Sequence, residues 1–205
     1  MRRVLFTQRV DVVESYNERR DCADQRIVEF LYCCGFIPVP LPNQYKIATA
    51  IFREVLDAGD LAGIVFTGGN SLVKYGGDAP ERDDMERMIY DMALAQGIPV
   101  YGFCRGMQLI LDCHGVLLEK VEGHVAVHHL VKGLRCNAER NSYHTLGCVS
   151  VNEEIEILAR SEDGVIEAAK VIGKPVYATM WHPEREDPFL EDDIKCVKDL
   201  FNGGE

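Results

Sequence analysis

The stretch "IPVYGFCRGMQLI", Ile98–Ile110, joins an apolar run to a helical pattern through a cysteine with a glycine two residues away on either side. The apolar run predicts a buried strand, and the residues after Cys104 predict a helix. A G-x-C-x-G sequence between a strand and a helix has the form of a nucleophile elbow. The helix start favours the thiolate and offers the backbone N–H of Arg105 to a developing oxyanion. The alternative is an incidental buried cysteine near glycines.

Strand and helix patterns alternate on both sides of this stretch. The apolar spacing predicts strands at 4–9, 36–41, 62–69, 98–103 and 174–181, and helices at 16–35, 45–59, 79–97, 105–115 and 188–201, the last of them capped by Asp187. Such alternation predicts an α/β fold with a mostly parallel central sheet and helices on both faces. Between Val116 and Trp181 short strands and turns predict a small antiparallel region. We expect residues 1–205 to form a single domain.

The composition narrows the class of protein. Lys and Arg number 22 against 33 Asp and Glu, so the net charge of −11 argues against nucleic-acid binding. We find no signal peptide and no apolar stretch long enough to span a membrane, and we therefore expect a cytoplasmic protein without a membrane partner. The eight cysteines have irregular spacings, which favours reduced thiols over disulfides. The sequence is compatible with a homodimer.

A cysteine nucleophile needs a base, and "MWHPERED", 180–187, offers the best candidate among six histidines. His182 follows a predicted strand, and Glu184 lies two residues further on. The carboxylate can turn back onto the imidazole and fix its tautomer and orientation. The alternative is a surface histidine beside an acidic segment.

The stretch "VFTGGNSL", 65–72, ends another predicted strand with Gly68 and Gly69. The carboxyl ends of parallel strands meet at one edge of a sheet, so these backbone N–H groups are expected beside Cys104. Glycines permit the unusual backbone angles of an oxyanion hole. The alternative is an ordinary turn at the end of a strand.

The segments "FTGGN", "GFCRGMQ", "NSYH" and "MWHPE" occur in the order typical of the class I glutamine amidotransferase superfamily, which the chain resembles over nearly its whole length. The resemblance implies a flavodoxin-like fold and a Cys-His-Glu triad. Cys104 would be the nucleophile, His182 the general base and acid, and Glu184 its orienter. Gly69 and Arg105 would supply the oxyanion N–H groups. Residues implied to bind the substrate are Gly68, Asn70, Gln108, Asn141, Ser142, Tyr143 and His144.

Arg105 after the nucleophile and Asn70 after the glycine pair resemble the γ-glutamyl hydrolase (peptidase C26-like) branch. Glutaminase subunits usually carry leucine and proline at these places. The branch implies a small-molecule γ-glutamyl substrate, a thioester intermediate and no synthetase partner. The chain departs from the branch at Thr145 and Leu146, which replace its usual histidine and glutamine. Glu167 in "DGVIEA" matches the branch and would lie near the site or end a hairpin.

Within this branch the compact chain is similar to the γ-glutamyl-CDP-amidate hydrolases of capsule phosphoramidate synthesis, which release glutamate and cytidine diphosphoramidate. An anionic nucleotide would need local cations in an acidic protein, and the candidates are Arg105, Lys74, Arg82 and Arg140. The alternatives are a general γ-glutamyl amine or peptide hydrolase, a glutaminase subunit that supplies ammonia, and a non-catalytic binding protein.

Three further histidines, His124, His128 and His129, raise the question of a metal site. No paired cysteine or carboxylate ligands stand at a suitable spacing. The sequence therefore predicts no metal and no cofactor, and places these histidines in a loop near the substrate entrance.

Overall fold

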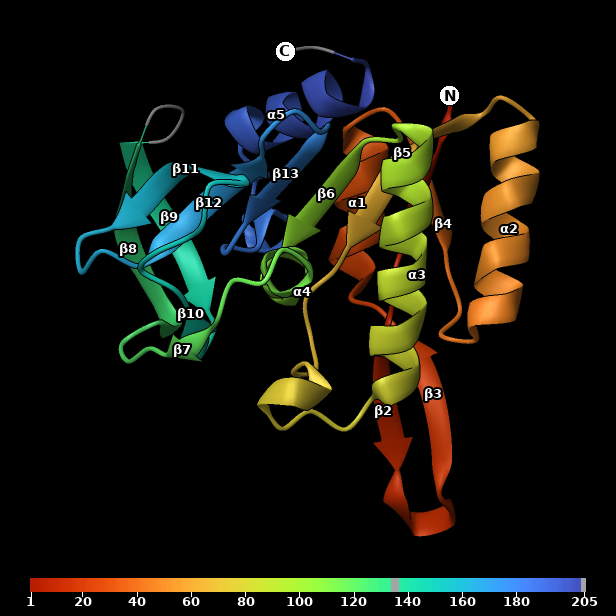
Figure 1. Ribbon diagram of the computed structural model, residues 1–205, viewed down its shortest axis with the longest axis horizontal. Helices are drawn as coiled ribbons and strands as arrows, with labels where there is room; N and C mark the ends of the chain where they lie inside the picture. The colour runs from red at the N-terminus through yellow and green to blue at the C-terminus, as the bar shows by residue number, and fades with distance from the viewer. Residues whose placement is uncertain (134–136, 204–205) are drawn as a thin grey trace.

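A single twisted sheet organises the protein (Figure 1). The computed structural model describes residues 1–133 and 137–203. In spatial order the described strands are β4 (Ile37–Pro40), β1 (Arg3–Phe6), β5 (Leu61–Phe66), β6 (Val100–Phe103), β13 (Val176–Thr179), β12 (Ile166–Val171), β11 (Ile155–Ser161), β8 (Val125–Gly133) and β9 (Asn137–Tyr143).

The sheet has a parallel half and an antiparallel half. From β4 to β13 neighbouring strands run parallel, and from β13 to β9 they run antiparallel. The predicted parallel sheet and the predicted antiparallel region are both confirmed, and the antiparallel strands continue the same sheet. A short pair, β7 (Glu119–Lys120) and β10 (Leu146–Gly147), lies outside it.

Helices cover both faces of the parallel half. One apolar core joins the sheet to α2 (Tyr45–Asp57), α3 (Pro80–Gln96) and α4 (Arg105–Cys113). A second core joins the opposite face to α1 (Gln25–Cys33) and α5 (Glu191–Phe201). The side chains of β1 alternate between them, because Leu5 packs in the first core while Val4 and Phe6 pack in the second. Burial on both faces explains why these strands read as continuous apolar runs.

The helix predicted from residue 16 is wrong in its first part. A hairpin of β2 (Arg9–Val13) and β3 (Glu18–Cys22) occupies that region, and it projects from the body of the protein in Figure 1. The chain turns at Asn17, which has a left-handed φ of 52°. Only after Asp24, whose side chain accepts a hydrogen bond from the Arg26 N–H, does α1 begin. Antiparallel pairing with β2 thus overrides the helical propensity of residues 18–22.

The prediction that Asp187 caps the last helix is also wrong. The helix α5 begins at Glu191, after a short 3-10 turn at Pro183–Arg185. Between these elements the chain docks onto α1, where the Arg26 guanidinium donates to the Glu186 carbonyl at 2.6 Å and lies 4.2 Å from the Phe189 ring. These contacts hold residues 186–189 against α1 and delay the start of α5.

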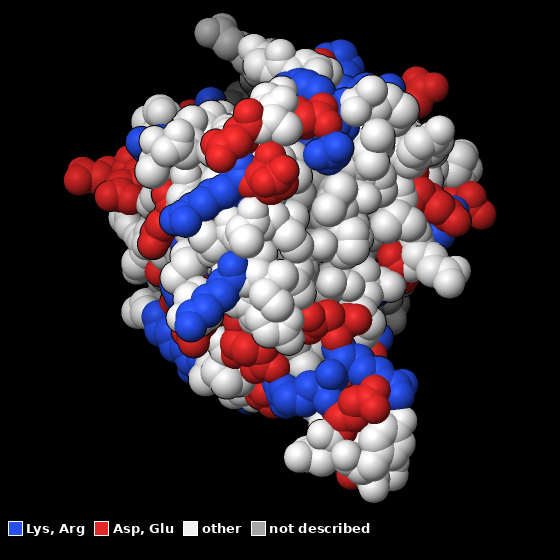
Figure 2. Space-filling view, turned by 90° about the vertical axis from the view of Figure 1, so that its right-hand side faces the viewer, with Lys and Arg blue, Asp and Glu red and all other residues white. Residues whose placement is uncertain are grey.

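Charged residues of both signs are mixed over the face in Figure 2, where blue and red atoms alternate without forming one basic patch. Among the described residues, no helix combines the length and the apolar character needed to cross a bilayer.

Candidate active site

Cys104 lies at the turn between β6 and α4, as the elbow pattern predicted. Its φ of 51° and ψ of −110° are unusual for a residue with a side chain. The two flanking glycines are required by packing. A Cβ on Gly102 would lie 2.8 Å from the backbone of Gly106, and a Cβ on Gly106 would overlap the carbonyl oxygen of Phe66. The elbow therefore lets α4 pack directly on β5 and β6.

His182 and Glu184 lie together just beyond the end of β13. The imidazole Nδ1 is 2.7 Å from Glu184 Oε1, and both side chains are buried. Asn141 holds the His182 backbone on both sides: its Oδ1 accepts from the His182 N–H at 3.0 Å and its Nδ2 donates to the His182 carbonyl at 2.8 Å. The rings of Phe103 and Tyr143 pack edge-on against the imidazole. These contacts fix the position and the tautomer of His182.

The charge of His182 depends on its two neighbours. Burial lowers the pKa of the imidazole, but the adjacent Cys104 thiolate and the Glu184 carboxylate outweigh it and raise the pKa to about 9. At neutral pH His182 is therefore protonated. An imidazolium beside Cys104 can stabilise a thiolate there and can donate a proton.

The glycine pair packs against the imidazole of His182. A Cβ on Gly68 would lie 2.7 Å from His182 Cε1, so only glycine fits there. Gly69 has a φ of 82°. The Arg82 guanidinium gathers the carbonyls of this loop, with Nη2 2.8 Å from the Thr67 oxygen and Nη1 2.6 Å from the Gly69 oxygen. The carbonyls are thereby drawn toward Arg82.

Arg82 and Arg105 do not serve as free cations, which corrects the role predicted for both. Both guanidinium groups are buried in a cluster with Asp83 and Glu86. Arg82 Nε lies 2.9 Å from one Glu86 oxygen, while Arg105 pairs with the other Glu86 oxygen and with Asp83. Two positive and two negative charges compensate inside the fold, so neither arginine is available to an anionic ligand.

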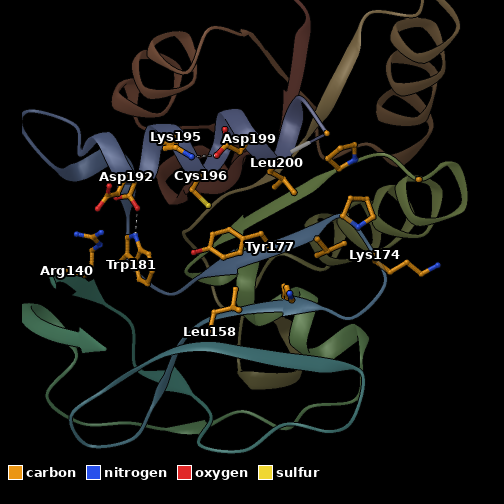
Figure 3. A pocket seen from close by; sticks show the side chains of 17 residues that line it. Arg140, Leu158, Lys174, Tyr177, Trp181, Asp192, Lys195, Cys196, Asp199 and Leu200 are labelled. Atoms are coloured by element: carbon orange, nitrogen blue, oxygen red, sulfur yellow. Dashed lines mark hydrogen bonds and ion pairs between the residues drawn. The ribbon is translucent and has the colours of Figure 1, made fainter. Parts of the chain in front are cut away.

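Lys74 and Arg140, the other two cations predicted to bind the nucleotide, have other contacts in the structure. Lys74 Nζ pairs with Asp112 at 2.6 Å. Arg140 lies 5.4 Å from the Trp181 ring and lines a cavity of about 850 Å³ between α5 and the antiparallel strands, together with Tyr177 and Leu158 (Figure 3). Side chains alternate along a strand, so Arg140 and its neighbour Asn141 face opposite sides of β9.

The sequence reasoning missed the cations of the cleft itself. A cavity of about 140 Å³ lies against Gly68 and His182, and both Arg9 and Arg185 line it. Arg9 comes from the β2–β3 hairpin, whereas Arg185 follows Glu184 and stacks 4.2 Å from the Tyr143 ring. The position of Arg9 depends on the hairpin, which the sequence had not indicated.

Several residues implied to bind substrate use their side chains internally. Asn70 accepts from the Val10 N–H at 2.8 Å and donates to the Val10 carbonyl at 3.0 Å, which ties the hairpin to the glycine loop. Gln108 donates to the Leu146 carbonyl at 3.1 Å. Ser142 Oγ donates to the His124 carbonyl at 2.8 Å. We interpret these residues as positioning groups, because their polar atoms already have protein partners.

Of the three histidines expected in a loop, His124 lies in the connection between β7 and β8, and the expectation is wrong for the other two. His128 and His129 lie within β8, and His124 immediately precedes it. His124, His144 and Glu167 form a buried group whose ligand atoms lie within 4.8 Å of one another.

We predict that Gly68→Ala lowers kcat at least tenfold without unfolding the protein. The added methyl group displaces the imidazole, which Asn141 and Glu184 hold in place. Circular dichroism and a thermal melt check the fold, and steady-state kinetics check the rate. A variant with full activity would contradict the tight contact between Gly68 and His182.

We predict that kcat/KM falls as the pH rises through about 9, because His182 then loses the proton that it gives to the leaving group. Because the pKa of His182 is raised from 6.5 to about 9 on folding, its protonation contributes fully to folding stability below about pH 6.5. This contribution is lost as the pH rises from about 6.5 to about 9. Glu184→Gln removes an anion that raises this pKa, so the falling limb shifts to lower pH and the rate drops about a hundredfold or more. An unshifted limb in Glu184→Gln would assign it to another group.

The chain is similar in sequence to two γ-glutamyl hydrolases. The chain is 27% identical over 202 residues to the γ-glutamyl-CDP-amidate hydrolase of Campylobacter jejuni, a match that covers 96% of each chain. It is 29% identical to the γ-glutamyl-γ-aminobutyrate hydrolase of Escherichia coli (strain K12), over 90% of this chain and 88% of that one.

The fold has a counterpart among solved structures. A GMP synthase subunit from Thermoplasma acidophilum matches with a TM-score of 0.72 at 18% identity, over 99% of this chain and 96% of that one. The Peptidase C26 family model matches residues 6–135 and 130–184. Because the match covers most of the sequence, the chain belongs to the Peptidase C26 family.

Proposed function

We propose that this protein hydrolyses the γ-glutamyl amide bond of a small molecule, with Cys104 as nucleophile, His182 as base and acid, and Glu184 as orienter. The observation that carries the proposal is the imidazole of His182, paired at 2.7 Å with Glu184 and coupled electrostatically to the strained Cys104. The two hydrolases among its relatives support the same reaction class.

In the first half-reaction the Cys104 thiolate attacks the γ-carbonyl carbon, and the carbonyl oxygen becomes an oxyanion. Collapse of this intermediate breaks the carbon–nitrogen bond, and the His182 imidazolium gives its proton to the departing nitrogen. A thioester remains on Cys104. In the second half-reaction His182 takes a proton from water, the hydroxide attacks the thioester, and glutamate leaves as the thiolate re-forms.

The oxyanion needs two backbone donors. Arg105 begins α4, so its N–H belongs to the first turn, where helical amides have no partner within the helix. Gly69 would supply the second donor, since Arg82 Nη2 donates to the Gly68 carbonyl at 3.0 Å and the N–H of the same peptide, that of Gly69, points the opposite way. In this arrangement Arg82 and Arg105 act through backbone geometry rather than through charge on the substrate.

We propose γ-glutamyl-CDP-amidate as the substrate, with cytidine diphosphoramidate as the leaving group and capsule modification as the setting. The support is the hydrolase of Campylobacter jejuni named above, because its alignment with this chain covers 96% of each protein. The cleft also contributes Arg9 and Arg185, which suit the phosphates of a nucleotide. The reaction needs no synthetase partner, because water is the acceptor.

We predict that Cys104→Ala abolishes turnover while the thermal melt changes little, because the substitution removes a thiol at a turn. A γ-glutamyl chloromethyl ketone should label the native protein at Cys104 alone, as mass spectrometry of the peptides would check. Selective labelling should disappear in His182→Asn, which lacks the imidazolium. Turnover in Cys104→Ala would exclude the triad and would favour a binding protein on this fold.

We predict that the protein prefers γ-glutamyl-CDP-amidate to glutamine and to γ-glutamyl-γ-aminobutyrate in kcat/KM. Arg9→Ala and Arg185→Ala should raise KM for the nucleotide substrate about tenfold or more and change KM for glutamine little, because only the nucleotide carries phosphates. Lys74→Ala is the matched control, since Lys74 is a cation that does not line this cleft. The rate of glutamate release from each of the three substrates gives kcat/KM. An equal kcat/KM for the simple amines would contradict the nucleotide assignment and would favour a general γ-glutamyl hydrolase.

A further inference from the structure

Four side chains converge in the antiparallel half, outside the triad. His124 precedes β8, His129 lies within it, His144 follows β9, and Glu167 lies on β12. Glu167 Oε1 is 3.3 Å from His124 Nδ1, 3.4 Å from His144 Nε2 and 3.7 Å from His129 Nε2. Ligands bound tetrahedrally to Zn²⁺ at about 2.0–2.1 Å lie about 3.3–3.4 Å from one another. The ligand atoms of His124, His144 and Glu167 all lie within 4.8 Å of one another, which suits a ligand set around one metal ion, and His129 lies beside this set.

These distances are too long for good hydrogen bonds, which are about 2.7–3.2 Å for N–H and O partners. Both carboxylate oxygens of Glu167 and the inward nitrogens of His124, His129 and His144 are buried without a hydrogen-bond partner. Glu167 has no solvent exposure, and its ion-pair partners among the described residues are these histidines. A buried carboxylate that accepts no hydrogen bond is costly, and one shared cation would satisfy Glu167, His124 and His144.

The outer nitrogens of two histidines have partners that set their tautomers. His124 Nε2 lies 2.9 Å from Asp163 Oδ2, and Ser161 Oγ donates to the other oxygen of Asp163. His144 Nδ1 lies 3.1 Å from the Leu146 carbonyl, to which it donates. A ring that carries its only N–H on this outer nitrogen turns a lone pair toward Glu167. Metal-bound histidines commonly have this kind of outer carboxylate or carbonyl partner.

We propose that His124, His144 and Glu167 bind one divalent transition-metal ion, with Zn²⁺ as the best match to two imidazoles and a carboxylate. The two positive charges of Zn²⁺ would balance the negative charges of Glu167 and Asp163. Three protein ligands leave the fourth position of a tetrahedral site to a water molecule. The sequence predicted no metal because the ligands come from three separate segments.

The metal would stabilise the segment next to the triad. The Leu146 carbonyl that accepts from His144 also accepts from Gln108 on α4. The Glu167 carbonyl accepts from the Met180 N–H at 2.7 Å, two residues before His182. The ion thus joins β8, β9 and β12 beside the base without touching the reacting atoms. The inference does not depend on the proposed substrate.

The test measures metal directly, in the full chain carrying Cys104→Ala, which prevents binding at the triad thiol. Inductively coupled plasma mass spectrometry should find about one Zn²⁺ per chain. After removal of metal with a chelator and dialysis, added ZnSO₄ should raise the Tm by roughly 10 °C at a large excess over Kd. Co²⁺ should give the visible spectrum of a tetrahedral site without thiolate charge-transfer absorption, which separates this site from one at a surface cysteine.

The variants distinguish the site from scattered surface histidines. Glu167→Gln should lose the bound Zn²⁺ and the rise in Tm, and Asp163→Asn should lower the Zn²⁺ affinity about 10–100-fold. His128→Ala is the matched control on the same strand, and it should bind Zn²⁺ as the parent does. The proposal is overturned if the chelated parent takes up no Zn²⁺ by calorimetry, since protonated histidines alone then balance Glu167. Equal loss in His128→Ala would overturn it too.

Discussion

Glu86 forms ion pairs with Arg82 and Arg105 inside the fold. The residues at the edge of the sheet that carries the candidate site depend on these ion pairs for their positions. Breaking a buried pair by removing one partner is strongly unfavourable, so the four charges of the cluster act as a unit. Arg82 uses its remaining N–H groups on the glycine-loop carbonyls. Arg105 fixes the first turn of α4 directly after Cys104. One buried carboxylate therefore connects α3, the glycine loop and the elbow.

Close packing of α4 on the sheet also positions Cys104. Gly102 and Gly106 allow α4 to approach β5 and β6 so closely that Cys104 adopts a strained conformation. Strain of this kind persists only where the surrounding structure over-determines it. On the other side, Asn141 binds both backbone groups of His182 and so connects the antiparallel half to the parallel half. The nucleophile and the base are thus positioned by different parts of the sheet.

The protein contains two buried polar centres that reach neutrality differently. The arginine–carboxylate cluster is neutral from its own side chains. The centre around Glu167 gathers three histidines whose inward nitrogens have no hydrogen-bond partner, and the outer nitrogens of His124 and His144 face Asp163 and the Leu146 carbonyl. A metal ion in this second centre would make it as rigid as the first. The first centre lies on α3 and α4, and Glu167 of the second lies on β12, the neighbour of β13.

The sequence by itself determined the alternation of strands and helices, the elbow at Cys104 and the pairing of His182 with Glu184. These features depend on apolar periodicity, glycine sterics and side chains two residues apart, all of which are local. Only the tertiary structure decided that Arg82 and Arg105 are buried, that Arg140 faces away from the cleft and that residues 18–22 form a strand. It also brought His129 and Glu167 together from different strands. The physical reason is that ion pairing and burial depend on distances between segments remote in the chain, which no local pattern encodes.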